Sequence, residues 1–486
     1  MMQKIFPLFL LLLTAVASCM DDEDFIETPT AKIAFSRDSV SLDTVLAGEA
    51  SSTYTFEVYN YNSKAIRLSS VRLESGADSP FRINVDGQPL ADGTGTDFTI
   101  SGGDSLRVFL FVKAPDSDSD DPVYVTDNLI FETSGGMQQS VPLEAWAQSV
   151  IQLSGRHITG NETFSARRPY QIMDSLVIDE GATLNVSAGV RFYLHKQAEV
   201  IVYGTLNVNG TAESNVVFRG DRLGNMFTAQ PYDRIPAQWG GITFKGSSYG
   251  NTLNFADIHS GTYGIRCDSS DVTRPKLDME GCILHNMAGD CLNARASNIY
   301  VSNTQITNAA GNCVTLRGGQ SSFVHCTIAN FYVFTGGRGI ALDFANFDGT
   351  TRLPMDLLQC YNCIVTGYSE DEILGSQSED NPDDAFNYYF KNCLLNTVAP
   401  TDSVTLTHFP GCIWDVTGNR VCREDNFSPA FDLNALTFSF QPDTLSPAID
   451  AADLETARRY APTDRLGRSR LADGAPDIGC YEAIKP

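Results

Sequence analysis

The chain has 486 residues and a formal net charge of −25, with 34 Lys and Arg against 59 Asp and Glu. Hydrophobic residues at 42% and charged residues at 19% are typical of a globular chain and exclude global disorder. Nucleic acid and an anionic bilayer surface are disfavoured as partners, because either would repel so acidic a surface. The length predicts about two to four domains. Abundant Gly, Thr, Ser, Asn, Val and Ile favour a mostly β protein.

Residues 1–18 have the pattern of a signal peptide, with Lys4 as the positive region and an apolar stretch at 6–13 that is too short for a permanent membrane span. The segment ends in Val-Ala-Ser before Cys19, which resembles a bacterial lipobox. This resemblance implies that Cys19 carries acyl chains and anchors the protein in a lipid bilayer. The alternative is an ordinary secreted protein that is cut nearby, with Cys19 incidental.

Four acidic residues follow the cysteine directly: Asp21, Asp22, Glu23 and Asp24. This cluster resembles the export signal that sends some Gram-negative lipoproteins to the outer face of the outer membrane. The implied location is therefore the cell surface. The alternative is a solvated acidic tether, which is what charge runs usually form. Under both interpretations, residues 19–30 form a flexible, lipidated tether.

Residues 31–149 alternate polar and apolar side chains with a period of two, for example at 52–60 and 106–112. Such runs predict antiparallel strands that are buried on one side, and Asp-Gly and Gly-Gly pairs between them predict turns. About seven strands at this spacing indicate an immunoglobulin-like β-sandwich. The strand order around the Asn-Tyr-Asn run at 60–62 resembles the ASH/PapD-like modules of bacterial surface proteins. No catalytic set stands out, so we expect this module to be a spacer.

Residues 150–440 contain short strands separated by Gly and Asn. The apolar centres Leu284, Ile306 and Ile328 lie 22 residues apart, and a second row with the same period includes Cys291 and Cys313. Two rows that share one period predict a single-stranded parallel β-helix, in which equivalent positions stack. We expect Cys313 to point inward, and the residues after it to alternate, with Val314 outward and Thr315 inward. The opposite phase, with Val314 buried, is the alternative.

Two further segments carry a family resemblance. Residues 179–244 resemble the first coils of right-handed β-helix repeat proteins of the pectate-lyase-like superfamily. The motifs at 446–450, 464–468 and 476–482 resemble the closing segment of "choice-of-anchor Q" surface β-helix proteins. The resemblance implies a right-handed coil and a closing segment, 441–486, that runs back along the helix and seals its end. It implies a fold but no single activity.

The cysteines of the β-helix region share positions with aliphatic residues. They are therefore expected to be reduced thiols in a narrow core. Cys412 and Cys422 are the candidate disulfide, because the Thr-Gly-Asn run between them suggests a hairpin turn. A lone CxxC at 360–363 and six scattered His residues argue against a zinc site, so no metal and no cofactor are expected.

An enzymatic role requires a cluster of titratable side chains on one face. None of the four sequence motifs of polygalacturonase-type hydrolases lies on a predicted coil of the β-helix region. An Asp-Asp pair, Asp383-Asp384, is present, but in an acidic insertion that contains Pro. Pectate-lyase chemistry needs calcium-binding carboxylates beside an Arg or Lys base. The loose candidates, each expected to be a solvated side chain on an outward position, are Asp257, His259, Asp268, His285, Asp290, Arg295, His325, Arg338 and Asp343. Asp257 and Arg266 are expected to share a groove. The acidic stretches 116–121 and 370–384 are expected to be loops rather than calcium sites.

The sequence thus predicts an all-β lipoprotein of the bacterial cell surface, with a lipidated tether, an Ig-like spacer and a right-handed parallel β-helix. The predicted function is the binding of a glycan or another extracellular partner without catalysis, and no catalytic residue is assigned. One alternative is a polysaccharide lyase or glycoside hydrolase with divergent motifs. The other is a structural adhesin. Convergence of two carboxylates and a Lys, Arg or His on one exposed face would separate these alternatives.

Overall fold

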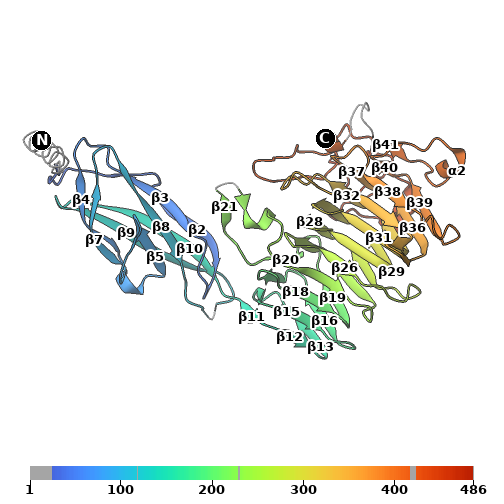
Figure 1. Cartoon of the computed structure of the whole chain (residues 1–486), viewed down its shortest axis with the longest axis horizontal. Coiled ribbons are helices and arrows are strands. Elements are labelled where there is room, and N and C mark those ends of the chain that lie inside the picture. The colour runs from blue at the N-terminus through green and yellow to red at the C-terminus, as the bar shows by residue number, and fades with distance from the viewer. Residues whose placement is uncertain (1–23, 118, 228–229, 416–422, 485–486) are drawn as a thin grey trace, which may run out of the picture. The chain divides into compact units, whose positions relative to one another are not determined.

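The computed structural model describes residues 24–117, 119–227, 230–415 and 423–484. The chain divides into two compact units, Met1–Ser149 and Val150–Pro486, and each is nearly all β (Figure 1). Among the described residues, none of the helices combines the length and the apolar character that crossing a membrane requires.

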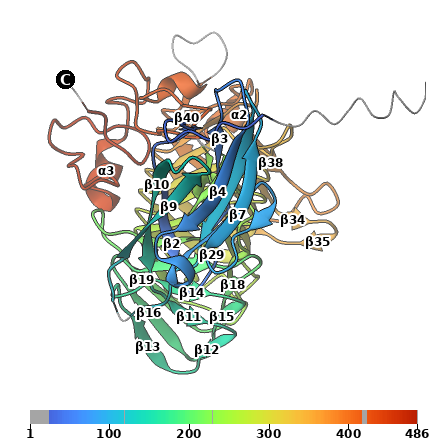
Figure 2. The same ribbon diagram turned by 90° about the vertical axis from the view of Figure 1, so that its left-hand side faces the viewer.

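The first unit is a β-sandwich of two five-stranded sheets (Figure 2). One sheet has the order β1 (Ala34–Phe35), β3 (Tyr54–Tyr59), β8 (Ser105–Val112), β5 (Phe81–Val85) and β6 (Gln88–Pro89). The other has the order β2 (Val40–Leu46), β10 (Gln138–Gln148), β9 (Val123–Thr133), β4 (Ile66–Leu73) and β7 (Thr94–Ile100). The β2–β10 pair is parallel and the other pairs are antiparallel. The predicted Ig-like module is confirmed.

Alternation of side chains builds the sandwich core. In β8, Leu106, Val108 and Leu110 are buried, and Arg107 and Phe109 between them face away from the core. The Asn-Tyr-Asn run is structural, because the buried Asn60 donates to the carbonyl oxygens of Ile100 and Ser101. This amide therefore joins two turns of the sandwich.

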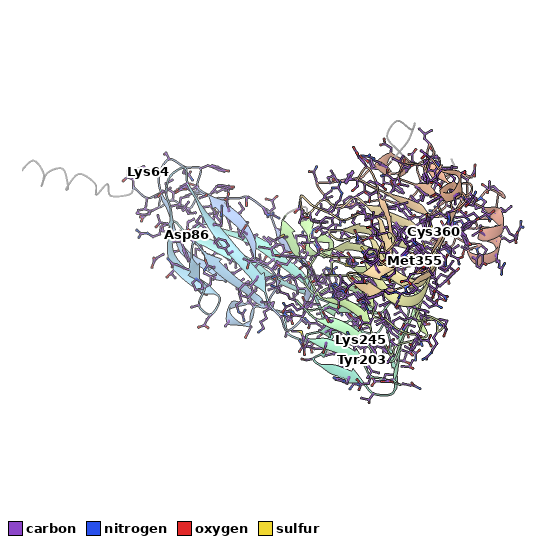
Figure 3. All side chains as sticks on the ribbon, turned by 45° about the vertical axis from the view of Figure 1, so that its right-hand side comes forward. Lys64, Asp86, Tyr203, Lys245, Met355 and Cys360 are labelled. Atoms are coloured by element: carbon purple, nitrogen blue, oxygen red, sulfur yellow. The ribbon has the colours of Figure 1, made fainter. Side chains whose placement is uncertain are left out.

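The described part of the predicted tether is bound to the sandwich. The backbone N–H of Ala65 donates to Asp24, and the N–H of Ile26 donates to Ala65. The Asp24 carboxylate also forms an exposed ion pair with Lys64 at 3.0 Å (Figure 3). Residues 24–26 thus belong to the sandwich edge, although the sequence places them in a free tether. Cys19, Asp21, Asp22 and Glu23 lie outside the described residues.

The second unit is a parallel β-helix with three ladders of strands, and most of its coils contribute to all three ladders. Ladder one contains β11 (Ile151–Leu153), β14 (Tyr170–Ile172), β17 (Arg191–Leu194), β20 (Val216–Gly220), β25 (Ala256–His259), β28 (Ile283–Met287), β30 (Gln305–Ala309), β32 (Thr327–Asn330), β37 (Ile364–Gly367), β40 (Leu394–Leu395) and β41 (Ile413–Trp414).

Ladder two contains β12 (Arg156–Ile158), β15 (Ser175–Ile178), β18 (Glu199–Val202), β23 (Gly241–Phe244), β26 (Ile265–Cys267), β33 (Leu342–Ala345) and β38 (Ile373–Ser376). Ladder three contains β13 (Asn161–Phe164), β16 (Thr183–Ser187), β19 (Thr205–Asn209), β24 (Asn251–Asn254), β27 (Leu277–Glu280), β36 (Met355–Tyr361) and β39 (Phe386–Lys391). The long strands β29 (Leu292–Ser302) and β31 (Val314–Val324) run through both of these ladders.

The predicted inward row is confirmed. Leu284, Ile306 and Ile328 are fully buried, and strand pairing places them directly above one another in ladder one. The cysteines of the same coils, including Cys313, are buried as free thiols. Cys360 is another buried free thiol (Figure 3). Cys412 contacts the carbonyl oxygen of Phe390 through its Sγ atom at 3.5 Å. Cys422 lies outside the described residues, so the Cys412–Cys422 pairing stays a prediction.

The predicted phase after Cys313 is wrong. Val314 is fully buried in the core and pairs with Leu292 and Leu342. Thr315 pairs with outward residues of the neighbouring coils, and its hydroxyl receives a hydrogen bond from the Asn312 amide. Cys313 lies at the corner before the strand, where two successive side chains enter the core. Strict alternation therefore begins one residue later than the sequence suggests.

The corner between ladders three and one repeats a left-handed backbone conformation. Residues with φ between 48° and 62° at this corner are Phe255, Gly281, Asn303, His325, Asn362 and Asn392. Gly and Asn tolerate this region best, which explains their frequency at this position.

The side chains of this corner bind the C-terminal segment, residues 423–484, which includes helix α3 (Leu454–Tyr460). The Asn303 amide donates to the carbonyl oxygen of Thr463 and the Asn392 amide to that of Ala451. The segment also covers ladder one with an apolar cluster of its own that includes Ile478 and Tyr481. Its described contacts thus run back along the side of the coils.

The C-terminal motifs form a buried polar network. Arg470 has no exposed surface, and its guanidinium donates to Glu482 Oε1 at 2.5 Å and to Asn303 Oδ1 at 3.0 Å. His325 is buried beside it and donates to the carbonyl oxygen of Gly479. Burial, together with the Arg470 charge, holds the pKa of His325 well below its usual range. His325 is thus a neutral structural residue.

The other short elements lie in connections and insertions. They are β21 (Asn225–Phe227), β22 (Gln230–Pro231), β34 (Phe347–Asp348), β35 (Thr351–Arg352), helix α2 (Ser403–Leu406) and the 3₁₀ turns η2 (Gly76–Asp78), η3 (Tyr232–Arg234) and η4 (Arg423–Asn426).

Candidate functional site

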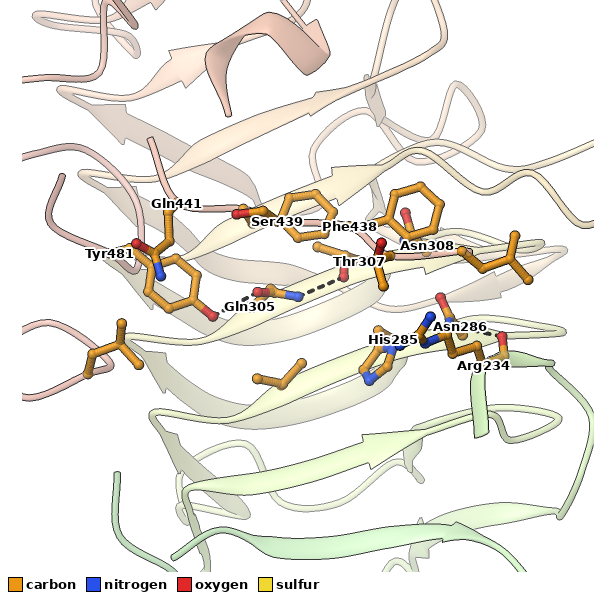
Figure 4. A pocket seen from close by; sticks show the side chains of 15 residues that line it. Arg234, His285, Asn286, Gln305, Thr307, Asn308, Phe438, Ser439, Gln441 and Tyr481 are labelled. Carbon is orange, nitrogen blue, oxygen red and sulfur yellow. Dashed lines mark hydrogen bonds between the residues drawn. The ribbon is translucent and has the colours of Figure 1, made fainter. Parts of the chain in front are cut away.

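A pocket of about 360 Å³ lies on the outer face of ladder one (Figure 4). One wall is Arg234, which belongs to the insertion between β20 and β23. The opposite wall is the C-terminal segment, with Phe438, Gln441 and Tyr481. The floor is the outward face of β28 and β30. We call this cavity the ladder-one pocket.

The insertion is held in place by the corners of two coils. Ser260 and Asn286 both have positive φ at the end of their ladder-one strands. The Ser260 hydroxyl donates to the carbonyl oxygen of Asp233, and the Asn286 amide donates to that of Arg234 at 3.0 Å. The Arg234 guanidinium in turn donates to the carbonyl oxygen of Ala435. The insertion therefore links the coils to the C-terminal segment.

A cluster of charged side chains lies beside the pocket. Asp257 and His259 are two residues apart on β25, so both point outward from the same strand. Strand pairing places His285 of β28 next to His259, and their rings stack with centroids 4.7 Å apart. His259 donates from Nδ1 to Asp257 Oδ1 and from Nε2 to Asp233 Oδ1, both at 2.8 Å. Its backbone carbonyl accepts from the buried indole of Trp239.

The charges in this cluster stabilise each other. Burial alone would lower the pKa of His259, but the Asp257 charge and the bonds to Asp233 and Asp257 raise it to about 9. Burial would raise the pKa of Asp233, but His259 and Arg219 lower it to about 2. The pKa of Asp257 is likewise held below its usual range, because His259 and His285 outweigh the effect of burial. Both carboxylates are therefore ionised at neutral pH.

The pocket itself combines amides, hydroxyls, cations and aromatic rings. The Gln305 amide donates to Thr307 and accepts from the Tyr481 hydroxyl at 2.8 Å. His285 is partly exposed and lines the pocket beside Arg234 (Figure 4). Asn286 is 2% exposed, and its Oδ1 atom has no hydrogen-bond partner among the described residues. An unpaired buried acceptor in a pocket wall is a group that a ligand can satisfy.

The structure brings together three of the residues that the sequence singled out, Asp257, His259 and His285. Their expected solvation is wrong for His259, which is only 5% exposed. Asp257 and Arg266 do not share a groove, since Arg266 lies on ladder two over the ring of Tyr263.

The remaining predicted residues lie elsewhere, and each has a structural partner. Three of them form ion pairs: Asp268 with Lys245, Asp343 with Arg317, and Arg295 with Asp348. The guanidinium of Arg338 lies over the ring of Tyr368. The Asp290 carboxylate accepts hydrogen bonds from the Asn293 amide and from the backbone N–H of Asn312. In the acidic stretch 370–384, Glu372 accepts from two backbone N–H groups and Asp384 pairs with Arg352. In the stretch 116–121, Asp116 accepts from the backbone of Ser117.

Sequence reasoning missed Arg219, Asp233, Arg234, Asn286 and the C-terminal wall. The long interval between Phe218 and Trp239 does indicate an insertion between strands. Nothing in the repeat shows which face that insertion covers, because its contacts are with residues distant in the sequence.

Comparisons with known proteins give little further information. The chain matches no protein-family model and no curated protein. Among solved structures, it is similar to the ASH/PapD-like domain 7 of human CEP192, with 11% identity over 26% of this chain and 90% of that one, at a TM-score of 0.18. It is also similar to a family 123 glycoside hydrolase from Clostridium perfringens, with 8% identity over 26% of each chain, at a TM-score of 0.19. Scores this low carry no argument about function.

Proposed function

We propose that this protein is a lipoprotein of the bacterial cell surface that binds a glycan in the ladder-one pocket without cleaving it. The observation that carries the proposal is the lining of the pocket. Amides and hydroxyls match sugar hydroxyls, and Phe438 and Tyr481 offer apolar ring surface. Arg234 adds a cationic group and His285 an imidazole ring, and the Arg234 charge favours a glycan with an acidic substituent.

Two carboxylates, Asp233 and Asp257, do converge with histidines beside the pocket, which is the arrangement expected of an enzyme. Their charge state nevertheless supports binding rather than hydrolysis. Glycoside hydrolysis uses one carboxyl group as a general acid, and that group needs a raised pKa. The pKa of Asp233 is lowered instead, and Asp257 is shifted in the same direction. Both also share His259 as a hydrogen-bond donor. This pair is therefore suited to a fixed charge network rather than to proton transfer.

A glycan array with purified residues 20–486 tests the proposed binding, followed by calorimetry on each hit. We expect the double variant Phe438→Ala, Gln441→Ala to bind at least tenfold more weakly. The matched control is Tyr389→Ala, Gln359→Ala, which removes half-buried side chains of similar type from ladder three. Equal losses in the two double variants would contradict the pocket assignment. Turnover of a bound glycan would favour the alternative enzyme.

The location rests on the N-terminal sequence alone. Cys19→Ala should release the protein from the membrane fraction or leave it unprocessed. Changing Asp21, Asp22, Glu23 and Asp24 together to Ala should keep the protein lipidated but protect it from protease added to intact cells. If that variant stayed as accessible to protease as the wild type, the acidic residues would not be an export signal.

A further inference from the structure

Three potential metal ligands meet on the outer face of ladder one. They are the carboxylate of Asp257 and the imidazoles of His259 and His285, whose ligating atoms all lie within 4.8 Å of one another. Asp257 Oδ1 is 2.8 Å from His259 Nδ1 and 3.4 Å from His285 Nε2. Ligand atoms of a tetrahedral zinc ion, at about 2.0–2.1 Å from the metal, are about 3.3–3.4 Å apart. The cluster is therefore close to the dimensions of such a site.

The surroundings of His259 are those of a metal-binding histidine. Metal-ligating His residues generally donate their second ring nitrogen to a carboxylate, which fixes the orientation of the ring. Here His259 Nε2 donates to Asp233 Oδ1 at 2.8 Å, and this leaves Nδ1 directed at Asp257. Asp233 is itself held by Arg219 at 2.7 Å. This supporting carboxylate comes from the insertion, which is absent from the regular repeat.

We propose that Asp257, His259 and His285 bind one divalent transition-metal ion, Zn²⁺ in the first instance. The ion takes the place of the proton that His259 Nδ1 donates to Asp257, and that proton is released to solvent. Two imidazole nitrogens and one carboxylate oxygen suit Zn²⁺ rather than Ca²⁺ or Mg²⁺, which prefer oxygen ligands. The sequence had predicted no metal site.

Binding requires movement of side chains only. The two imidazole rings are now stacked with 26° between their planes, so they must tilt to direct both nitrogens at one ion. His285 is 25% exposed and lines the ladder-one pocket, which gives it room to turn and gives the ion a path of entry. A three-ligand zinc site keeps a fourth position open. That position would face the pocket, where an oxygen of a bound molecule can reach it.

The test uses residues 20–486 without an affinity tag, treated with chelator and then titrated with Zn²⁺ against a chromophoric chelator. We expect one ion per chain, and a d–d absorption band when Co²⁺ replaces Zn²⁺. His285→Ala should weaken binding at least tenfold, and Asp233→Asn about 10- to 100-fold. His157→Ala is the matched control, because His157 forms a comparable pair with Asp179 at 2.8 Å but has no second His beside it.

Two results would overturn the proposal: no ion bound to the wild-type chain, or equal affinity in His285→Ala and His157→Ala. Because His285 is partly exposed, His285→Ala should still fold, and it keeps the test valid if Asp233→Asn does not fold. The inference does not rest on glycan binding. Glycan binding measured with chelator present tests the proposed function alone. Metal binding measured without glycan tests the metal site alone, so either proposal can fail without the other.

Discussion

Ladders one and two run through the same coils, yet their outer faces differ in chemistry. On ladder two the charges form separate pairs: Lys245–Asp268 at 3.1 Å and Arg295–Asp348 at 3.0 Å are open to solvent, and Arg317–Asp343 at 2.6 Å is more buried. On ladder one, the insertion and the C-terminal segment cover the strands. His259 on β25 and His325 at the adjoining corner thereby become buried members of polar networks. Coverage by non-repeating segments therefore turns a regular solenoid face into a site, since buried charges must be paired whereas exposed ones need not be.

The largest effect should come from a charge placed in the core that both ladders share. Val314→Asp buries a carboxylate among Leu292 and Leu342 and should cost more than about 4 kcal/mol of unfolding free energy. Cys313→Val keeps a similar volume and should cost less than about 1.5 kcal/mol. Denaturant unfolding of the two variants checks this. A Val314→Asp variant as stable as the wild type would place Val314 outside the core.

The second-largest loss of stability should come from the charge network under the C-terminal segment, compared with an ion pair on ladder two. Arg470→Leu leaves Glu482 buried without its partner and should cost about 3–5 kcal/mol. The control, Arg295→Leu, removes an exposed pair on ladder two and should cost about 1 kcal/mol or less. Urea denaturation gives both values. If the two variants lost similar amounts of unfolding free energy, the buried C-terminal network would contribute no more to stability than an exposed ion pair does.

A smaller effect is the pH dependence of stability that the buried Glu372 carboxyl group causes. Burial raises the pKa of Glu372 from 4.5 to about 7, so the folded state favours its protonated form. Its contribution to stability is present below about pH 4.5 and is lost as pH rises through about 7. The melting temperature between pH 5 and pH 8 should therefore fall less steeply in Glu372→Gln than in the wild type. The exposed Glu379→Gln serves as control, and an unchanged slope in Glu372→Gln would contradict this assignment.

The smallest effect belongs to ladder two. Lys245→Ala breaks the exposed pair with Asp268 and should change the unfolding free energy by no more than about 1 kcal/mol. The change should shrink further at high salt, because exposed charges are screened. Thermal melts at two salt concentrations measure it. A large, salt-independent loss would show that ladder two is covered as ladder one is.

The repeat made much of this fold predictable. Leu284, Ile306 and Ile328 must stack because a solenoid core is built from equivalent positions, and a constant period is visible in one sequence. The phase at Val314 was missed because a corner admits two successive inward residues. The nearness of His259 and His285 follows from the alignment of their coils. Asp233 and Tyr481 reach the same site through an insertion and a returning chain end, which have no repeat to align.

Hydrogen–deuterium exchange with a bound glycan tests the central claim most directly. Slower exchange is expected at 283–287, 305–309 and 436–441, which form the floor and one wall of the ladder-one pocket. Exchange at 292–295 and 314–317 of ladder two should stay unchanged. Protection confined to ladder two, with none around the ladder-one pocket, would contradict the assignment of the binding site.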